Sequence, residues 1–260
     1  MAVPRTVVDP RRVKVARLLV VGALAVLAAF AGGVATAGGP QSCGSGSHGS
    51  SGYAYAGHQS QIKGHGVRAR ITLLTRPEVE SGHAAAWIGV GGPDSGPNGE
   101  DEWIQVGIAS LPNLEPMLYA EIARPGAGPE FVPLQDTVPV GATRSLAVLE
   151  MNKRPGYWRV WVDGEPVTAP IWLPGSSGRW EPIATAESWN GGQPICNRFA
   201  FRFERVGVAG WRGGSWHQFH PGYRFLDQGY SLRQLRPSPA GARTLASDSI
   251  RPFAFEAVSS

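Results

Sequence analysis

The sequence predicts an all-β domain over residues 53–260, folded as an antiparallel sandwich or jelly roll of two sheets. Two observations predict this fold. Short runs in which apolar and polar residues alternate follow one another, with frequent Gly and Pro between them, and no amphipathic helical repeat interrupts them. A range of this length can bury a full core without a metal ion or extra disulfides.

Residues 1–37 have the features of a secretory signal. Five basic residues precede an apolar run at residues 18–30, which we expect to be helical, and Ala35-Thr36-Ala37 then supplies an A-x-A cleavage site. An uncleaved anchor is the alternative, because extending the run to Val34 gives about 20 residues, enough to span a bilayer. We therefore expect a secreted or extracytoplasmic protein that touches a membrane only if this segment is retained.

Residues 38–52 are rich in Gly and Ser and poor in apolar side chains, so we interpret them as a linker. They contain Cys43, and Cys196 is the second of the two cysteines in the chain. An even number of cysteines in an exported chain suggests a disulfide. Such a bond would tie the linker to the loop that follows Glu187.

The alternation is clearest in two segments of the domain. Apolar side chains occupy every second position of residues 67–73, and three phenylalanines do so in residues 199–203. A period of two is typical of a half-buried strand. The turn Asp163-Gly164 predicts a hairpin of residues 157–162 and 165–173, whose second strand is placed at a sheet edge by Pro166 and Pro170. Residues 222–235 and 250–257 are predicted as closing strands.

The charge distribution argues against a nucleic-acid partner. Of 24 Lys and Arg and 20 acidic residues, five basic residues and one acid lie in residues 1–37, which leaves 19 charges of each sign in the remainder. Such a chain lacks the basic surface of a nucleic-acid-binding protein, and we interpret Arg159 and Arg205 as solvated strand positions. No phosphate loop or complete set of zinc ligands is present. We expect no cofactor, no metal and a monomer.

Two strand-like segments carry the candidate chemistry. Residues two apart share one face of a strand, so Gln105 lies beside Trp103, and Glu187 lies beside Trp189. Each segment thus presents one amide or carboxylate next to an indole ring. We interpret these two tryptophans and Trp87 as candidates for the lining of a groove that holds a polar pair.

Six short motifs occur in the order found in the glutamic peptidases, the eqolisin family: Tyr55-Ala56-Gly57, Pro77-Glu78-Val79, Trp87-Ile88-Gly89-Val90-Gly91-Gly92, Trp103-Ile104-Gln105-Val106-Gly107, Tyr119-Ala120-Glu121 and Ala186-Glu187-Ser188-Trp189. The chain resembles that family over residues 53–208. The resemblance implies a concanavalin-like β-sandwich with a substrate cleft across one sheet. It also implies that Gln105 and Glu187 are the catalytic pair of an endopeptidase, with Glu121 near the polypeptide substrate. The family's aspartate is replaced by Gly91, and Asp94 or the acids at 100–102 are candidate substitutes.

These residue types suit peptide hydrolysis. A glutamate carboxylate can take a proton from a water molecule as that water attacks the peptide carbonyl, and can then return the proton to the leaving amine. A neutral carboxamide can donate an N–H to the developing oxyanion. Because a glutamate is ionised only above its ordinary pKa of about 4.3, an acidic optimum would be natural.

The alternative is a non-catalytic binding module on the cell surface. Concanavalin-like sandwiches with an aromatic-lined sheet hold carbohydrate or peptide by ring stacking and amide hydrogen bonds, and Gln105, Glu187 and Asn190 would serve that purpose equally well. A sugar hydrolase is less favoured than the peptidase or the binding module, because the E-x-D-x-x-E strand of laminarinase-like families is absent.

Overall fold

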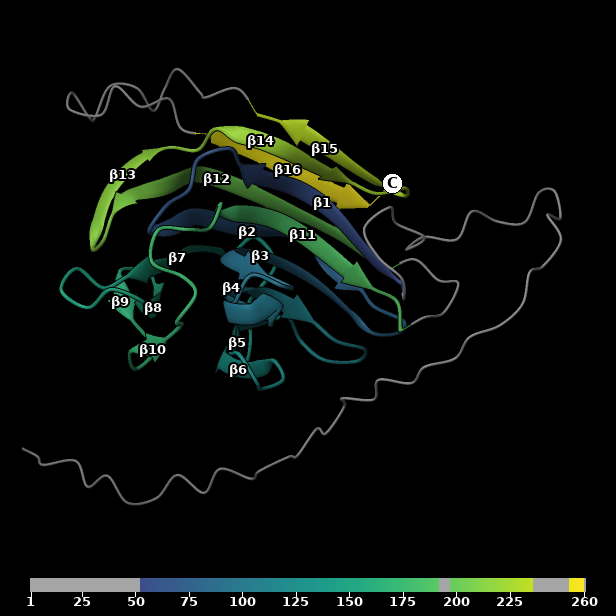
Figure 1. Cartoon of the computed structure of the whole chain (residues 1–260). Coiled ribbons are helices and arrows are strands. Elements are labelled where there is room, and N and C mark those ends of the chain that lie inside the picture. The colour runs from purple at the N-terminus through teal and green to yellow at the C-terminus, as the bar shows by residue number, and fades with distance from the viewer. Residues whose placement is uncertain (1–51, 192–196, 236–252, 260) are drawn as a thin grey trace, which may run out of the picture. The chain divides into compact units, whose positions relative to one another are not determined.

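The computed structural model describes residues 52–191, 197–235 and 253–259, which form two antiparallel sheets packed face to face (Figure 1). The predicted all-β sandwich is therefore confirmed. Within these ranges the single helical element is a short 3-10 turn, η1 (Pro97–Gly99). The predictions for residues 1–37, for the linker and for a Cys43–Cys196 disulfide fall outside the described residues.

The first sheet, called sheet I, carries the segments of the predicted polar pair. Its strands lie in the order β14 (Pro221–Leu226), β1 (Tyr53–Ser60), β11 (Ile183–Trp189), β3 (His83–Gly92), β4 (Glu102–Ser110), β5 (Met117–Ala123) and β6 (Glu130–Gln135). Every neighbouring pair in this sheet is antiparallel. Strands that are distant in sequence, such as β1, β11 and β3, thereby come to lie side by side.

The second sheet, sheet II, covers the inner face of sheet I. Its main path runs through β10 (Ile171–Trp172), β8 (Tyr157–Val162), β7 (Thr143–Glu150), β2 (Gly66–Glu78), β12 (Arg198–Trp211), β16 (Phe253–Ser259) and β15 (Tyr230–Gln234). Two short strands lie off this path: β13 (Gly214–Gln218) pairs with β12, and β9 (Glu165–Pro166) pairs with β8.

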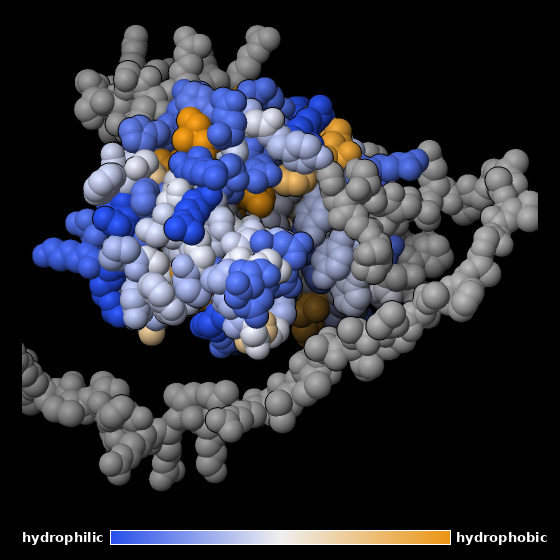
Figure 2. Space-filling model, viewed as in Figure 1, coloured by the Kyte–Doolittle hydropathy of each residue, from blue (hydrophilic) through white to orange (hydrophobic). Residues whose placement is uncertain are grey.

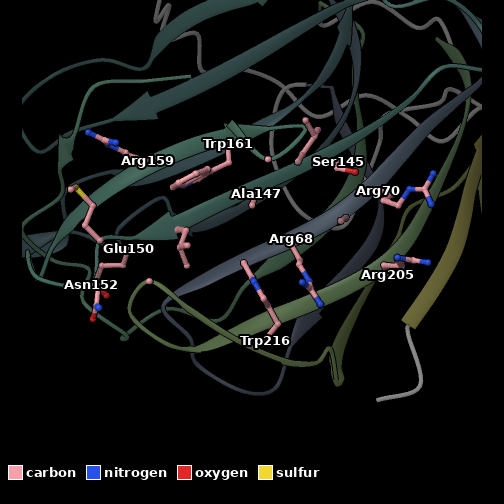
Figure 3. Close-up of a pocket in the computed structure, with 16 residues that line it drawn as sticks. Arg68, Arg70, Ser145, Ala147, Glu150, Asn152, Arg159, Trp161, Arg205 and Trp216 are labelled. Carbon is pink, nitrogen blue, oxygen red and sulfur yellow. The ribbon is translucent and has the colours of Figure 1, made fainter. Parts of the chain in front are cut away.

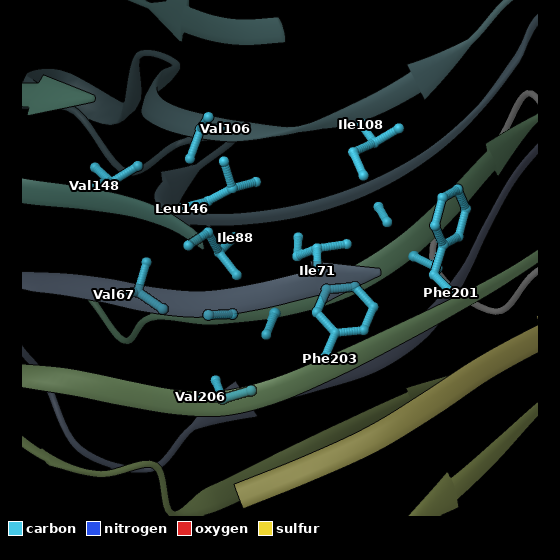
Figure 4. Close-up of a cluster of buried hydrophobic side chains, with 14 of the residues drawn as sticks. Val67, Ile71, Ile88, Val106, Ile108, Leu146, Val148, Phe201, Phe203 and Val206 are labelled. Carbon is cyan, nitrogen blue, oxygen red and sulfur yellow. The ribbon is translucent and has the colours of Figure 1, made fainter. Parts of the chain in front are cut away.

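Strand alternation produces the core between the sheets. Ile88 and Val106 of sheet I point toward Ile71 and Phe203 of sheet II, and all four are fully buried (Figure 4). The phenylalanines predicted to face inward do so, and Phe203 stacks on Phe255 with ring centroids 4.5 Å apart. Burial of these side chains is the main force that holds the sheets together. The alternate residues of each strand consequently face outward.

The face of the domain shown in Figure 2 is mostly hydrophilic, and its hydrophobic residues form small separate spots. This distribution agrees with an apolar core enclosed between the sheets. Among the described residues no helix is long and apolar enough to cross a membrane.

The predicted hairpin is present. Val162 of β8 pairs with Glu165 of β9, and the two turn residues, Asp163 and Gly164, have φ values of 51° and 92°. Two positive φ values are the geometry of the tight turn that matches strand twist. The predicted second strand, residues 165–173, is interrupted: β9 and β10 are two-residue strands that each pair with β8.

The closing strands are also present, but the predicted segment 222–235 is divided between the sheets. β14 pairs with β1 in sheet I, whereas β15 pairs with β16 in sheet II. Asp227 links the two parts, because its carboxylate accepts a hydrogen bond from the Tyr55 amide at 2.8 Å. The chain therefore crosses from sheet I to sheet II between these two strands.

Candidate functional site

The outer face of sheet I contains a groove of about 580 Å³ that is lined by both Gln105 and Glu187. Glu187 on β11 is level with Ala85 of β3, whereas Gln105 on β4 is level with Gly89, four residues further along the same strand. The two polar residues therefore lie on a diagonal across β3. The groove follows this diagonal over β11, β3 and β4.

Glu187 is held by two donors from the neighbouring strand β3. Its Oε1 accepts a hydrogen bond from His83 Nε2 at 2.7 Å, and its Oε2 accepts one from the indole N–H of Trp87 at 3.1 Å. Burial and the charge of the same carboxylate raise the pKa of the neighbouring Tyr55. A carboxylate can accept about four hydrogen bonds, so the two donors leave room for a bound water molecule. The side chain is thus fixed in orientation and still able to act on water.

His83 is the cation of this arrangement. Burial alone would lower its pKa, but the hydrogen bond to Glu187, together with the charges of Glu187 and Glu121, outweighs burial and raises the pKa above 6.5. Its backbone is also fixed, because the Asn197 side chain donates to the carbonyls of His83 and Trp189 at 3.2 and 2.9 Å. Asn197 thereby ties the start of β3 to the end of β11.

Glu121 is a second carboxylate in the groove. It lies directly opposite Gln105 in the pairing of β4 with β5, and its Oε1 accepts a hydrogen bond from the Trp103 indole at 3.0 Å. Burial, and then the negative charge of Glu187, raise its pKa, although the Trp103 bond and the charge of His83 act in the opposite direction. The groove therefore holds one carboxylate beside a cation and another that retains its proton to higher pH, an arrangement suited to acid and base roles.

Gln105 keeps one amide proton available. Its Nε2 donates to the Tyr119 hydroxyl at 3.3 Å, and a primary amide has a second N–H. Burial, followed by the charges of Glu187 and Glu121, raises the pKa of Tyr119 well above 10, so its phenol stays neutral. Tyr119 is itself held in place, because its ring stacks on Phe131 with centroids 5.0 Å apart.

The structure brings five of the predicted site residues together. The groove is lined by Trp87, Trp103, Gln105, Glu121 and Glu187. Trp189 does not line it; instead its ring stacks on Tyr53 with centroids 6.0 Å apart and is tilted against His83 with centroids 5.8 Å apart. Asn190 is buried outside the lining.

Three side chains that lie at the predicted polar pair were not selected from the sequence: His83, Tyr55 and Tyr119. Alternation along β3 places His83 and Trp87 on one face of the strand, which only weakly indicates that His83 belongs to the site. Contact with Glu187, however, depends on pairing between segments 104 residues apart. Among the described residues no group of three His, Cys, Asp or Glu side chains is placed to hold a metal ion.

The backbone at residue 91 does not accommodate the aspartate that the resemblance predicts there. Gly91 has a φ of 83°, and a Cβ added there would lie 2.2 Å from the Glu102 carbonyl oxygen. The candidate substitutes point elsewhere. Glu102 is fully buried and accepts a hydrogen bond from the Gly175 amide, and Asp101 accepts one from the amide of Asp94. None of the acids of this loop lines the groove.

Comparison with known proteins gives similarity in fold. No family model matches the chain, and no curated protein matches it. Scytalido-glutamic peptidase, solved with a peptide-based transition-state analog, is 12% identical with a TM-score of 0.46, covering 78% of this chain and 97% of that one. SCP-B of the eqolisin family, in complex with the tripeptide Ala-Ile-His, is 11% identical with a TM-score of 0.45, covering 80% and 98%.

A Bacillus licheniformis β-glucanase is also similar, at 16% identity and a TM-score of 0.32, covering 51% of this chain and 56% of that one. Peptidases and glycoside hydrolases thus both occur among the similar solved structures. At these identities and scores, the similarity does not identify the chemistry of the groove, which has to be argued from its own residues.

Proposed function

We propose that the protein is a peptidase of the glutamic type, which cleaves polypeptides in the groove of sheet I at acidic pH. The observation that carries the proposal is the combination, in one groove, of a carboxylate held by two donors and a carboxamide with an available N–H. Glu187 is the proposed general base, and Gln105 is the proposed oxyanion donor.

In the proposed reaction, a water molecule occupies a remaining acceptor position of Glu187 and attacks the scissile carbonyl. Glu187 takes the water proton and later returns it to the leaving amine. The second N–H of Gln105 donates to the oxyanion that forms. Protonated Glu121, which is the cross-strand neighbour of Gln105, donates a hydrogen bond to a peptide carbonyl of the bound substrate.

The electrostatics support activity on the acid side of neutrality. Glu187 has to be ionised, whereas Glu121 has to be protonated and His83 is most useful as a cation. Because the pKa values of Glu121 and His83 are raised, both side chains keep their protons to higher pH. Activity should therefore fall as the pH rises through these two values, and also fall at low pH when the base is protonated.

The test is cleavage of an unstructured protein between about pH 2 and pH 7 by the full-length wild type and by two variants, Glu187→Gln and Gln105→Ala. Loss of one oxyanion donor should reduce the rate about 100-fold to 1,000-fold. Loss of the base should reduce it at least as much. The exposed Glu165→Gln is the matched control and should retain activity. Absence of cleavage by folded wild type at every pH would overturn the proposal.

A non-catalytic carbohydrate-binding module is the second candidate. It is favoured by the aromatic lining, in which Tyr55, Trp87, Trp103 and Phe225 surround the polar pair. Binding of neutral oligosaccharides on a glycan array, weakened by Trp103→Ala, would support it. The exposed Trp211→Ala serves as the control for that array, because Trp211 lies on β12 of sheet II and outside the lining.

We also propose that the protein acts outside the cytoplasm, on the basis of the apolar run and A-x-A site in residues 1–37. Sequencing the N-terminus of the mature protein tests this, with a new terminus near residue 38 expected. A Cys43–Cys196 disulfide would then join the linker to the segment after β11. Peptide masses measured before and after reduction test that bond.

A further inference from the structure

A second groove, of about 700 Å³, lies on the outer face of sheet II. It is on the opposite side of the sandwich from the proposed active site, because the core separates the two outer faces. Its lining includes four arginines and two tryptophans: Arg68, Arg70, Arg159, Arg205, Trp161 and Trp216. No part of the proposed peptide hydrolysis uses these residues.

The central strands place Arg68 in the middle of this groove. Ala147 of β7 is paired with Arg68 of β2, and Trp161 of β8 is paired with Ala147 on its other side. Trp216 lies on β13, and the Arg68 guanidinium lies 4.8 Å from its ring centroid. The two indoles therefore lie on strands to either side of Arg68 (Figure 3).

A β-bulge adds one of the four arginines. Between Glu204 and Gly207, β12 contains one residue more than β2 opposite it, and the same extra residue occurs relative to β16. Arg205 occupies the bulge with a φ of 53°, a strained value for a residue with a side chain. Its exposed side chain lies with that of Arg70 at one end of the groove (Figure 3). The bulge thus adds a cation to this face.

The lining carries more positive than negative charge. Glu150 is its one acidic residue, and that carboxylate is fully buried and accepts hydrogen bonds from His65 Nδ1 and the Gly156 amide. Glu204 is level with Arg70 but lies outside the lining. In the part of the chain that the structure describes, Arg70, Arg159 and Arg205 make no ion pair with a carboxylate.

Arg70 and Arg205 are exposed, so their guanidinium groups are accessible to a ligand. Guanidinium groups bind carboxylates through two parallel hydrogen bonds, which requires a planar anionic group.

We infer that this groove binds an acidic oligosaccharide, a chain of sugar rings that carry carboxylate groups. The indole rings fit the faces of sugar rings, and the arginines fit the carboxylates. A nucleic acid is a poorer match, because its binding relies on an extended basic field, and residues 38–260 carry 19 charges of each sign.

The experiment is titration of the full-length protein with oligogalacturonate, a chain of sugar carboxylates, by calorimetry, with a neutral oligosaccharide of equal length beside it. We expect the acidic chain to bind and the neutral chain to bind at least about tenfold more weakly, because charge-assisted hydrogen bonds are the stronger class. Equal binding of both chains, or no binding of the acidic one, would overturn the inference.

Variants locate the binding. Arg70→Gln with Arg205→Gln should weaken oligogalacturonate binding about tenfold or more, whereas the exposed Arg179→Gln, which lies outside the groove, should leave it unchanged. Trp161→Ala removes a ring that would stack on a sugar, so it should also weaken binding. Circular dichroism verifies the fold of each variant. Unchanged binding in the folded double variant, or tighter binding of a single-stranded DNA oligonucleotide than of oligogalacturonate, would contradict the inference.

Discussion

Replacing His83 by Gln tests whether this histidine is the charge that stabilises Glu187. Glutamine retains an N–H donor but removes the positive charge. The glutamine amide still donates to the ionised carboxylate, so the substitution removes only the attraction between the two charges. The His83 side chain is 25% exposed and that of Glu187 is 11% exposed, so solvent screens part of this attraction. We expect the charge to contribute about 1 kcal/mol to the free energy of unfolding.

The direction of the pKa shift determines the pH range in which His83 stabilises the fold. Because the pKa of folded His83 is raised, this contribution is complete below the unfolded value of about 6.5 and disappears as the pH rises through the folded value. Urea unfolding followed by tryptophan fluorescence should therefore show His83→Gln less stable than wild type at about pH 5, with little difference at about pH 9. The exposed His220→Gln should match wild type at both. An equal loss at the two pH values would refute the electrostatic account.

Three further predictions concern stability. Gly91→Asp should destabilise the fold by about 1–3 kcal/mol in urea unfolding because of its positive φ, whereas Gly92→Asp, whose Cβ would meet only Ser95 Oγ at 3.7 Å, should be tolerated. A larger loss of stability in Gly92→Asp than in Gly91→Asp would contradict this. Glu121→Gln should stabilise the protein at neutral pH but not at about pH 4, because its raised pKa makes ionisation costly only as the pH rises; a pH-independent effect would exclude that cause. Phe203→Ala should cost about 3–5 kcal/mol by calorimetric melting, against under about 0.5 kcal/mol for the exposed Leu114→Ala.

The strands were predictable where neighbouring residues determine them. Alternation identified the inward phenylalanines of β12, and Asp163-Gly164 identified the hairpin, because both signals are local in sequence. The division of residues 222–235 between two sheets was not predictable. It depends on β14 finding β1 and on β15 finding β16, and pairing partners so distant leave no local pattern.

The candidate site shows the same limit. Gln105 and Glu187 could be selected from residue type and from the motifs around them, and both line one groove. The donor that holds Glu187 could not, because His83 reaches it through cross-strand pairing of β3 with β11. Arg205 was interpreted as an ordinary solvated position, since a bulge does not interrupt the composition of a strand.

The bulge in β12 has a consequence for how this surface can change over evolutionary time. If Arg205 were absent, the surrounding residues would alternate without a break, with Phe203, Val206 and Val208 inward and Glu204 and Gly207 outward. Deletion of a single codon would therefore remove one cation while every core side chain keeps its place. A lineage could gain or lose a positive charge on this face by inserting or deleting this one codon, and the protein would fold at each step.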